Sequence, residues 1–199
     1  MATKPTSLQD VFDRNQYDLK TAVTKSKSWF EQQVLLMNKQ AITPQKVLSG
    51  STQDLTVQVL PGYLYMYMYD PKTKADLPYY DRFPLVFPFR KVEGGFLGLN
   101  MHYLPYQLRI KLLDKLMVFA SNSKLNEATK LKYSWALIDG VSRYAEATPC
   151  VKHYLMSQVK SPFRKINSED WATAMMLPVE RFIGAAKDQV WMESKRKIR

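Results

Sequence analysis

The chain has 199 residues, of which 29 are basic and 18 acidic, so its formal net charge is +11. Hydrophobic residues make up 46% of it, which is enough for a core and too many for a disordered chain. No apolar run of about 18 residues occurs, so we expect no spanning helix and no membrane partner. Cys150 is the single cysteine, which excludes a disulfide within the chain and fits a reducing compartment.

The first predicted element is a helix over residues 17–40. Apolar side chains such as Leu19, Val23 and Phe30 recur there at helical spacings. The helix is expected to end at Thr43, because the following proline pushes that residue out of the helical region.

Three strands are predicted in the middle of the chain. Residues 57–69 alternate with period two and are apolar or aromatic on both sides, so protein should cover both faces. Residues 83–90 contain two prolines, which a sheet accepts only at an edge or a bulge. Gly94 and Gly95 then predict a tight turn into a third strand over residues 96–103.

The second half of the chain reads as helical. Apolar stripes, capping residues and prolines delimit the expected helices. These helices are predicted over residues 105–120, 126–145, 149–159, 167–177 and 179–199.

Together these elements predict an α+β fold. We expect a small antiparallel β-sheet or SH3-like barrel in the middle, flanked by an N-terminal helix and a C-terminal helical half. The whole chain, 1–199, is expected to be a single domain. Its parts would be an N-terminal arm and helix (1–54), a β-rich segment (55–104) and a helical part with a basic tail (105–199).

The positive charge is unevenly distributed. Residues 101–165 hold 11 basic and 4 acidic side chains, a surplus of +7, and four of the last five residues are basic. Such a surface either keeps the protein soluble or neutralises an acidic partner, and the more specific of these interpretations is that it binds the phosphates of DNA. The candidate DNA-binding residues are Arg109, Lys111, Lys115, Lys130, Lys132, Arg143, Lys160, Arg164, Lys165, Lys195, Arg196, Lys197 and Arg199.

Signals for catalysis are weak. His102 and His153 lie in apolar or aromatic surroundings without further ligands at metal-binding spacing, so packed or surface histidines are expected. Cys150 beside His153 could form a nucleophile pair, but a buried structural cysteine is the simpler interpretation. Phosphate-binding glycine loops are absent from the sequence. We therefore predict no catalytic residue, metal or cofactor, and a protein that is not an enzyme.

Tyrosines concentrate in the middle, where eight of the twelve lie between residues 63 and 106. They could form a sheet core, a protein–protein interface or a platform for unpaired bases. Few basic residues are interleaved with them, which favours the interface over the base platform. The candidate partner-interface residues are Tyr63, Tyr65, Tyr67, Tyr69, Tyr79 and Tyr80.

Two stretches in the middle carry a family resemblance, LPYYDRFPLVFP at residues 77–88 and GGFLGLNMHYLP at residues 94–105. Further matches are KHYLMS at 152–157, the Asp170–Trp171 pair and LPVERF at 177–182. With these motifs the chain resembles the DNA end protectors, small virion-associated proteins of contractile-tailed bacteriophages, over roughly residues 60–195.

The resemblance implies a non-enzymatic protein that is packaged with the genome. It would bind the end of the packaged double-stranded DNA and block host exonuclease when that end enters the next cell. Its location would be the virion, and the host cytoplasm during assembly. The alternative is a structural component of the phage neck, tail or baseplate that acts through contacts with other virion proteins.

Overall fold

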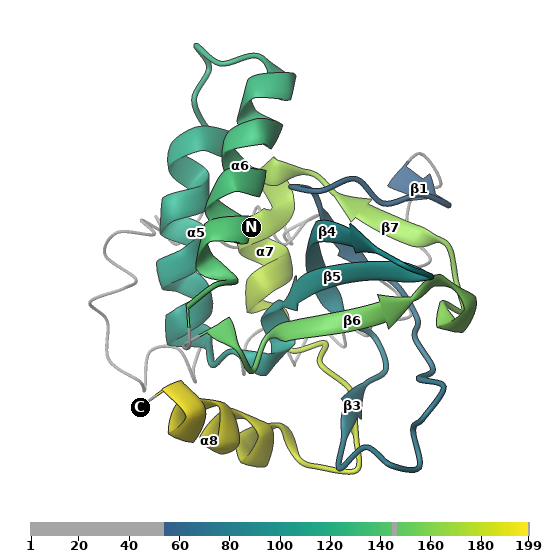
Figure 1. Ribbon diagram of the computed structural model, residues 1–199. Coiled ribbons are helices and arrows are strands. Elements are labelled where there is room, and N and C mark those ends of the chain that lie inside the picture. Colours follow the sequence, from purple (N-terminus) through teal and green to yellow (C-terminus); the bar gives the residue numbers. More distant parts are fainter. Residues whose placement is uncertain (1–53, 145–146, 199) are drawn as a thin grey trace, which may run out of the picture.

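The computed structural model describes residues 54–144 and 147–198, in which a sheet packs against a layer of helices (Figure 1). Six strands form the sheet in the order β1–β7–β2–β4–β5–β6, and each neighbouring pair is antiparallel. Their bounds are Leu55–Thr56 (β1), Leu64–Met66 (β2), Leu85–Val92 (β4), Gly95–Asn100 (β5), Val151–Leu155 (β6) and Phe163–Ile166 (β7). A separate ribbon pairs β3 (Tyr80–Asp81) with β8 (Phe182–Ile183).

The helices α5, α6 and α7 lie together on one side of the sheet, whereas α8 lies apart near β3 (Figure 1). Short 3-10 turns follow β5 and β6 and precede α7. The bounds of all seven are Met101–Tyr103 (η2), Tyr106–Ala120 (α5), Glu127–Val141 (α6), Met156–Gln158 (η4), Ser168–Asp170 (η5), Trp171–Met176 (α7) and Lys187–Ile198 (α8).

The two faces of the sheet are buried in two different clusters. Leu64 and Met66 of β2 join the larger core between sheet and helices, which also contains Ile110 of α5. Tyr65 and Tyr67 point to the other face, into a smaller aromatic cluster. This alternation confirms the prediction that both sides of the strand are covered, because successive side chains of a strand face opposite ways.

The predicted strand over residues 57–69 is nevertheless shorter than expected. Val57 and Leu60 are exposed, and the chain turns at Gly62, whose φ is +89°. Only Leu64–Met66 pairs in the ladder, with one further bridge from Tyr69 to Val159.

The hairpin of β4 and β5 follows the sequence prediction closely. The register of the ladder shifts between Pro88 and Arg90. The sheet thus accommodates this proline at a bulge, as expected. Gly94, with φ +68°, makes the tight turn between Val92 and Gly95.

The predicted helix over residues 149–159 is wrong. Val151–Leu155 is the edge strand β6, which pairs with β5, and Phe163–Ile166 is a further strand, β7, between β1 and β2. Both segments contain β-branched and aromatic residues, and pairing with β5 on one side, and with β1 and β2 on the other, decides their conformation over local helical propensity.

Of the remaining predictions, some are confirmed, some differ from the structure and some are not tested by it. The α+β class and the helices α5, α6 and α7 are confirmed, and the last helix begins at Lys187 instead of near residue 179. The expected helical half also supplies strands β6 and β7 to the sheet, and the SH3-like barrel is not confirmed. The helix over residues 17–40 lies outside the described residues, and the single domain stays a prediction.

Candidate nucleic-acid interface

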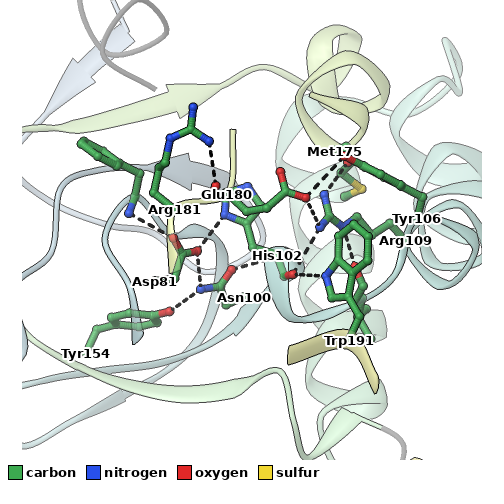
Figure 2. A network of polar contacts seen from close by, with 12 residues as sticks. Asp81, Asn100, His102, Tyr106, Arg109, Tyr154, Met175, Glu180, Arg181 and Trp191 are labelled. Carbon is green, nitrogen blue, oxygen red and sulfur yellow. Dashed lines mark hydrogen bonds and ion pairs between the residues drawn. The ribbon is translucent and has the colours of Figure 1, made fainter. Parts of the chain in front are cut away.

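Arg109, one of the predicted DNA-binding residues, lies at the centre of a buried polar network (Figure 2). Its Nε donates to the carbonyl of Leu104 at 2.7 Å, and its Nη1 donates to the carbonyl of Met175 at 3.0 Å. Its Nη2 donates to Glu180 Oε1 at 3.0 Å and to the carbonyl of His102 at 3.2 Å. Arg109 therefore holds η2, α5, α7 and the segment before β8 together.

Aromatic rings enclose the same guanidinium, which lies 4.7 Å from the centre of the Tyr106 ring and 5.4 Å from that of Trp191. Burial raises the pKa of Glu180, but the charge of Arg109 and several smaller contributions together outweigh it, so the pKa lies below its usual value. With no exposed surface, Arg109 cannot reach a phosphate in this conformation, and the prediction that it contacts DNA is corrected.

A second buried group extends the network toward the sheet. Asn100 donates to Asp81 at 3.1 Å and to the Tyr154 hydroxyl at 3.0 Å. His102 Nδ1 lies 2.7 Å from Asp81 Oδ2, and the imidazole has no exposed surface. The expectation of a packed His102 is confirmed, and its role here is to connect η2 with β3.

Cys150 and His153 do not form a nucleophile pair. Cys150 is buried, and burial raises the pKa of its thiol to about 12, opposite to what an activated thiolate requires. His153 lies exposed on β6, whereas Cys150 lies in the turn before this strand and is buried. Within residues 54–144 and 147–198, no three acidic, His or Cys side chains come together at metal-binding distance.

A cleft of about 360 Å³ gathers several of the residues that the sequence singled out. It lies where the start of β2, the first turns of α6 and the end of β7 meet. Its lining includes the predicted DNA-binding residues Lys130 and Lys165, the predicted partner residue Tyr63, and the polar residues Asn167 and Ser168.

Local sequence features set the walls of this cleft. Gly62 passes so close to α6 that an added Cβ would lie 2.7 Å from the carbonyl oxygen of Leu131. Asn126 caps α6 by accepting from the Thr129 amide at 2.9 Å, which places Lys130 in the first turns. On the other wall, Lys165 pairs in register with Tyr65 of β2.

The cleft is electropositive. The Lys165 ammonium lies 5.3 Å from the centre of the Tyr63 ring, and no carboxylate of the described residues lies within 4.0 Å of it. Lys130 pairs with Glu127 at 2.8 Å, but the Glu127 side chain is 78% exposed, so water screens this ion pair. Both lysines can therefore bind an anion without giving up a strong ion pair.

The other predicted basic residues are placed singly or in smaller groups. Arg164 is buried in β7, which corrects the expectation that it contacts DNA, and Arg143 pairs with Asp139, which also binds Arg90. Arg199 lies outside the described residues. The predicted DNA-binding residues whose side chains are exposed are Lys111, Lys115, Lys132, Arg143, Lys160, Lys195, Arg196 and Lys197.

One comparison with known proteins finds a match. A family model described as phage T4 terminal DNA protecting protein matches residues 8–196. The chain belongs to this family. No match was found among curated proteins or among solved structures.

Membership in the terminal DNA protecting family confirms the resemblance to phage DNA end protectors that the motifs indicated. The match includes every residue of the cleft and all of the predicted basic residues except Lys197 and Arg199. None of the helices described, α8 included, is long and apolar enough to span a membrane.

Three of the six tyrosines predicted to form a partner interface belong to the core. Tyr65, Tyr67 and Tyr69 are buried, and burial raises the pKa of all three phenols. Tyr67 packs edge-to-face against Phe163, with ring centres 4.7 Å apart. These three side chains are not available to another protein, which corrects their assignment to the predicted partner interface.

The other tyrosines of that set are partly exposed. Tyr63 lines the cleft, and Tyr80 lies in the two-stranded ribbon. Tyr79 donates to Glu193 of α8 at 2.7 Å, and burial raises the pKa of its phenol to about 12, assisted by that carboxylate. Tyr79 therefore fastens α8 to the segment before β3.

A basic residue outside the predicted set lies beside the tail. Lys152 of β6 holds its ammonium 4.0 Å from the centre of the Tyr103 ring. Burial lowers the pKa of Lys152, and the positive charge of Lys197 on α8 lowers it further. The tail thus lies near the sheet edge, which could not be predicted because residues 149–159 were expected to be helical.

Proposed function

We propose that this protein binds the end of packaged double-stranded DNA in the phage virion and shields it from host exonuclease, without catalysing a reaction itself. The observation that carries the proposal is the family match over residues 8–196, which covers nearly the whole chain. Family membership supports protection of DNA ends, and the surface chemistry of the described residues supports how it is achieved.

The proposed mechanism is occlusion. An exonuclease must bind the terminal nucleotides before it can hydrolyse the first bond, and a protein seated on the end competes for them. Lysines that contact backbone phosphates bind without regard to base sequence, as a protector of a DNA end requires. Exposed lysines such as Lys111, Lys115 and Lys132 add to the attraction that the cleft exerts.

A footprinting experiment tests the position of binding. A linear duplex labelled at one end is mixed with the protein and cut lightly with a non-specific endonuclease. We expect protection of the terminal base pairs and normal cutting of the interior, with protection lost as salt is raised because phosphate binding releases counterions. Uniform protection along the duplex, or protection unaffected by salt, would contradict end binding through phosphates.

A structural role in the neck, tail or baseplate is the second candidate. The observation in its favour is a groove of about 510 Å³ beside the exposed apolar residues Val57, Leu60 and Met156. Imaging of the intact particle separates the two functions, since contacts with virion proteins alone, far from the DNA end, would favour the structural role.

A further inference from the structure

An end of DNA differs chemically from its interior. It carries a terminal phosphate monoester, which is close to a dianion at neutral pH, whereas each internal phosphodiester carries one negative charge. It also exposes the terminal nucleotide, whose base is stacked on one face only. A protein that prefers ends must contact at least one of these two features.

We propose that the cleft between α6, β2 and β7 receives the terminal nucleotide and binds its phosphate monoester through Lys130 and Lys165. This inference rests on the proposed function, and it deepens it by naming the group that is recognised. The volume of about 360 Å³ falls at the lower end of the range for small-ligand sites, which suits a single nucleotide.

The charged groups of the cleft fit a dianion. Two lysines and one glutamate line it, and the ammonium of Lys165 has no carboxylate within 4.0 Å among the described residues. Lys130 would exchange its exposed partner Glu127 for the phosphate, which bears the higher charge. The dianion would neutralise both lysines.

The neutral groups of the cleft fit the rest of a nucleotide. Among the described residues the Tyr63 hydroxyl has no hydrogen-bond partner, and its ring offers an aromatic surface at the cleft wall. The side chains of Asn167 and Ser134 add groups that donate or accept hydrogen bonds with sugar oxygens.

Two other hollows of the described part are chemically less suited to this ligand. The hollow between α5 and the end of β5, about 570 Å³, is lined mainly by apolar residues such as Leu99, Leu108 and Val141. The groove beside Val57 is likewise mostly apolar, with its charges at the rim. Lys111 and Lys115 line the first hollow together with Asp114, and Arg90 and Lys91 line the groove. Apolar side chains nevertheless form most of both walls, and a phosphate against them would lose hydration.

A binding experiment with hairpin duplexes tests the inference. Each hairpin has one open blunt end that carries a 5′-phosphate, a 3′-phosphate or hydroxyls only, and a dumbbell closed at both ends serves as a DNA without ends. Fluorescence anisotropy at fixed salt gives each affinity. We expect at least one phosphorylated hairpin to bind roughly tenfold more tightly than the hydroxyl form, as a charge-assisted contact would give.

Matched variants assign the preference to the cleft. The variant Lys130→Gln/Lys165→Gln should bind phosphorylated and hydroxyl ends equally. Lys124→Gln, at an exposed lysine just before α6 that does not line the cleft, should keep the tenfold preference.

The outcomes separate this inference from the proposed function. If the wild-type protein prefers hairpins to the dumbbell but does not distinguish phosphate from hydroxyl, the phosphate site is overturned while end binding stands. The same holds if the double variant keeps the phosphate preference. Equal binding of hairpin and dumbbell by the wild-type protein would overturn both.

Discussion

Arg109 illustrates how a basic residue can be conspicuous in a sequence and still be unavailable to a ligand. Its guanidinium donates four hydrogen bonds inside the protein and pairs with Glu180, which has almost no exposed surface. A buried pair of this kind is worth little compared with apolar packing, but loss of one partner leaves the other charge uncompensated. Arg109 is therefore a structural residue whose removal should affect folding before binding.

Arg109→Met tests this role. We expect a loss of about 3–5 kcal/mol in the free energy of unfolding, measured by urea denaturation, because Glu180 would be left charged and buried. The control Lys111→Met changes an exposed residue of the same helix and should stay within about 0.5 kcal/mol. Unchanged stability of Arg109→Met with weakened DNA binding would instead restore a direct DNA contact.

The ion pair of Arg109 and Glu180 also predicts how the stability of the protein depends on pH. The pKa of Glu180 is lower in the folded protein than in the unfolded chain, so its stabilising contribution is present above the unfolded value, about 4.3, and is lost as the pH falls through the lower folded pKa. Glu180→Gln should therefore be less stable at pH 7 and should lose less stability on acidification. Parallel pH profiles of the two proteins would contradict this assignment.

Gly62 determines how closely the start of β2 approaches α6. Its φ of +89° and the 2.7 Å between an added Cβ and the Leu131 carbonyl oxygen both disfavour a side chain. Gly62→Ala should lower the free energy of unfolding by about 1–3 kcal/mol. Gly140→Ala is the matched control, since an added Cβ meets nothing within 4 Å on α6, and it should stabilise by up to about 1 kcal/mol.

Individual elements differ in how well their sequences predict them. Helices α5 and α6 follow from the spacing of their apolar residues, and the hairpin of β4 and β5 follows from its glycines and Pro88. Strands β6 and β7 were missed, because their conformation depends on pairing with strands far away in the sequence.

The candidate cleft shows the same limit. Lys130 and Lys165 were identified from charge, and Tyr63 was identified as a partner residue from its aromatic surroundings. Their proximity could not be predicted, because it requires β7 to pair with β2 in the register that places Lys165 opposite Tyr65. Without that strand, the two lysines belong to unrelated segments.

Helix α8 depends on a small number of contacts for its position. Trp191 donates from Nε1 to the His102 carbonyl at 2.8 Å and packs edge-to-face on Tyr106. In Trp191→Leu we expect the amides of residues 187–198 to exchange with solvent roughly tenfold faster, with the sheet unaffected, since local opening would cost less. Met192→Leu, at an exposed position, should leave exchange unchanged, and unaltered exchange in Trp191→Leu would contradict this role.

Within the described residues, the basic side chains behind the surplus of +11 are divided between the interior and separate surfaces. Arg109 and Arg164 are buried, the tail lies on α8 beside β6, and the cleft gathers two lysines where α6 meets the sheet. Much of the aromatic middle of the chain forms a core, although Tyr63 lines the cleft. The part of the positive charge that remains exposed is thus the part that can meet phosphates, and the cleft is where it is combined with an aromatic ring.

The most direct measurement is digestion of linear double-stranded DNA by a processive exonuclease in the presence of the purified protein. At low salt, we expect the rate of initiation to fall as protein is added and the rate of digestion after initiation to stay constant, because only the end is covered. The protein alone should release no nucleotides. Unchanged initiation at concentrations where the protein binds DNA, or equal slowing at every position along the duplex, would contradict the protection of ends.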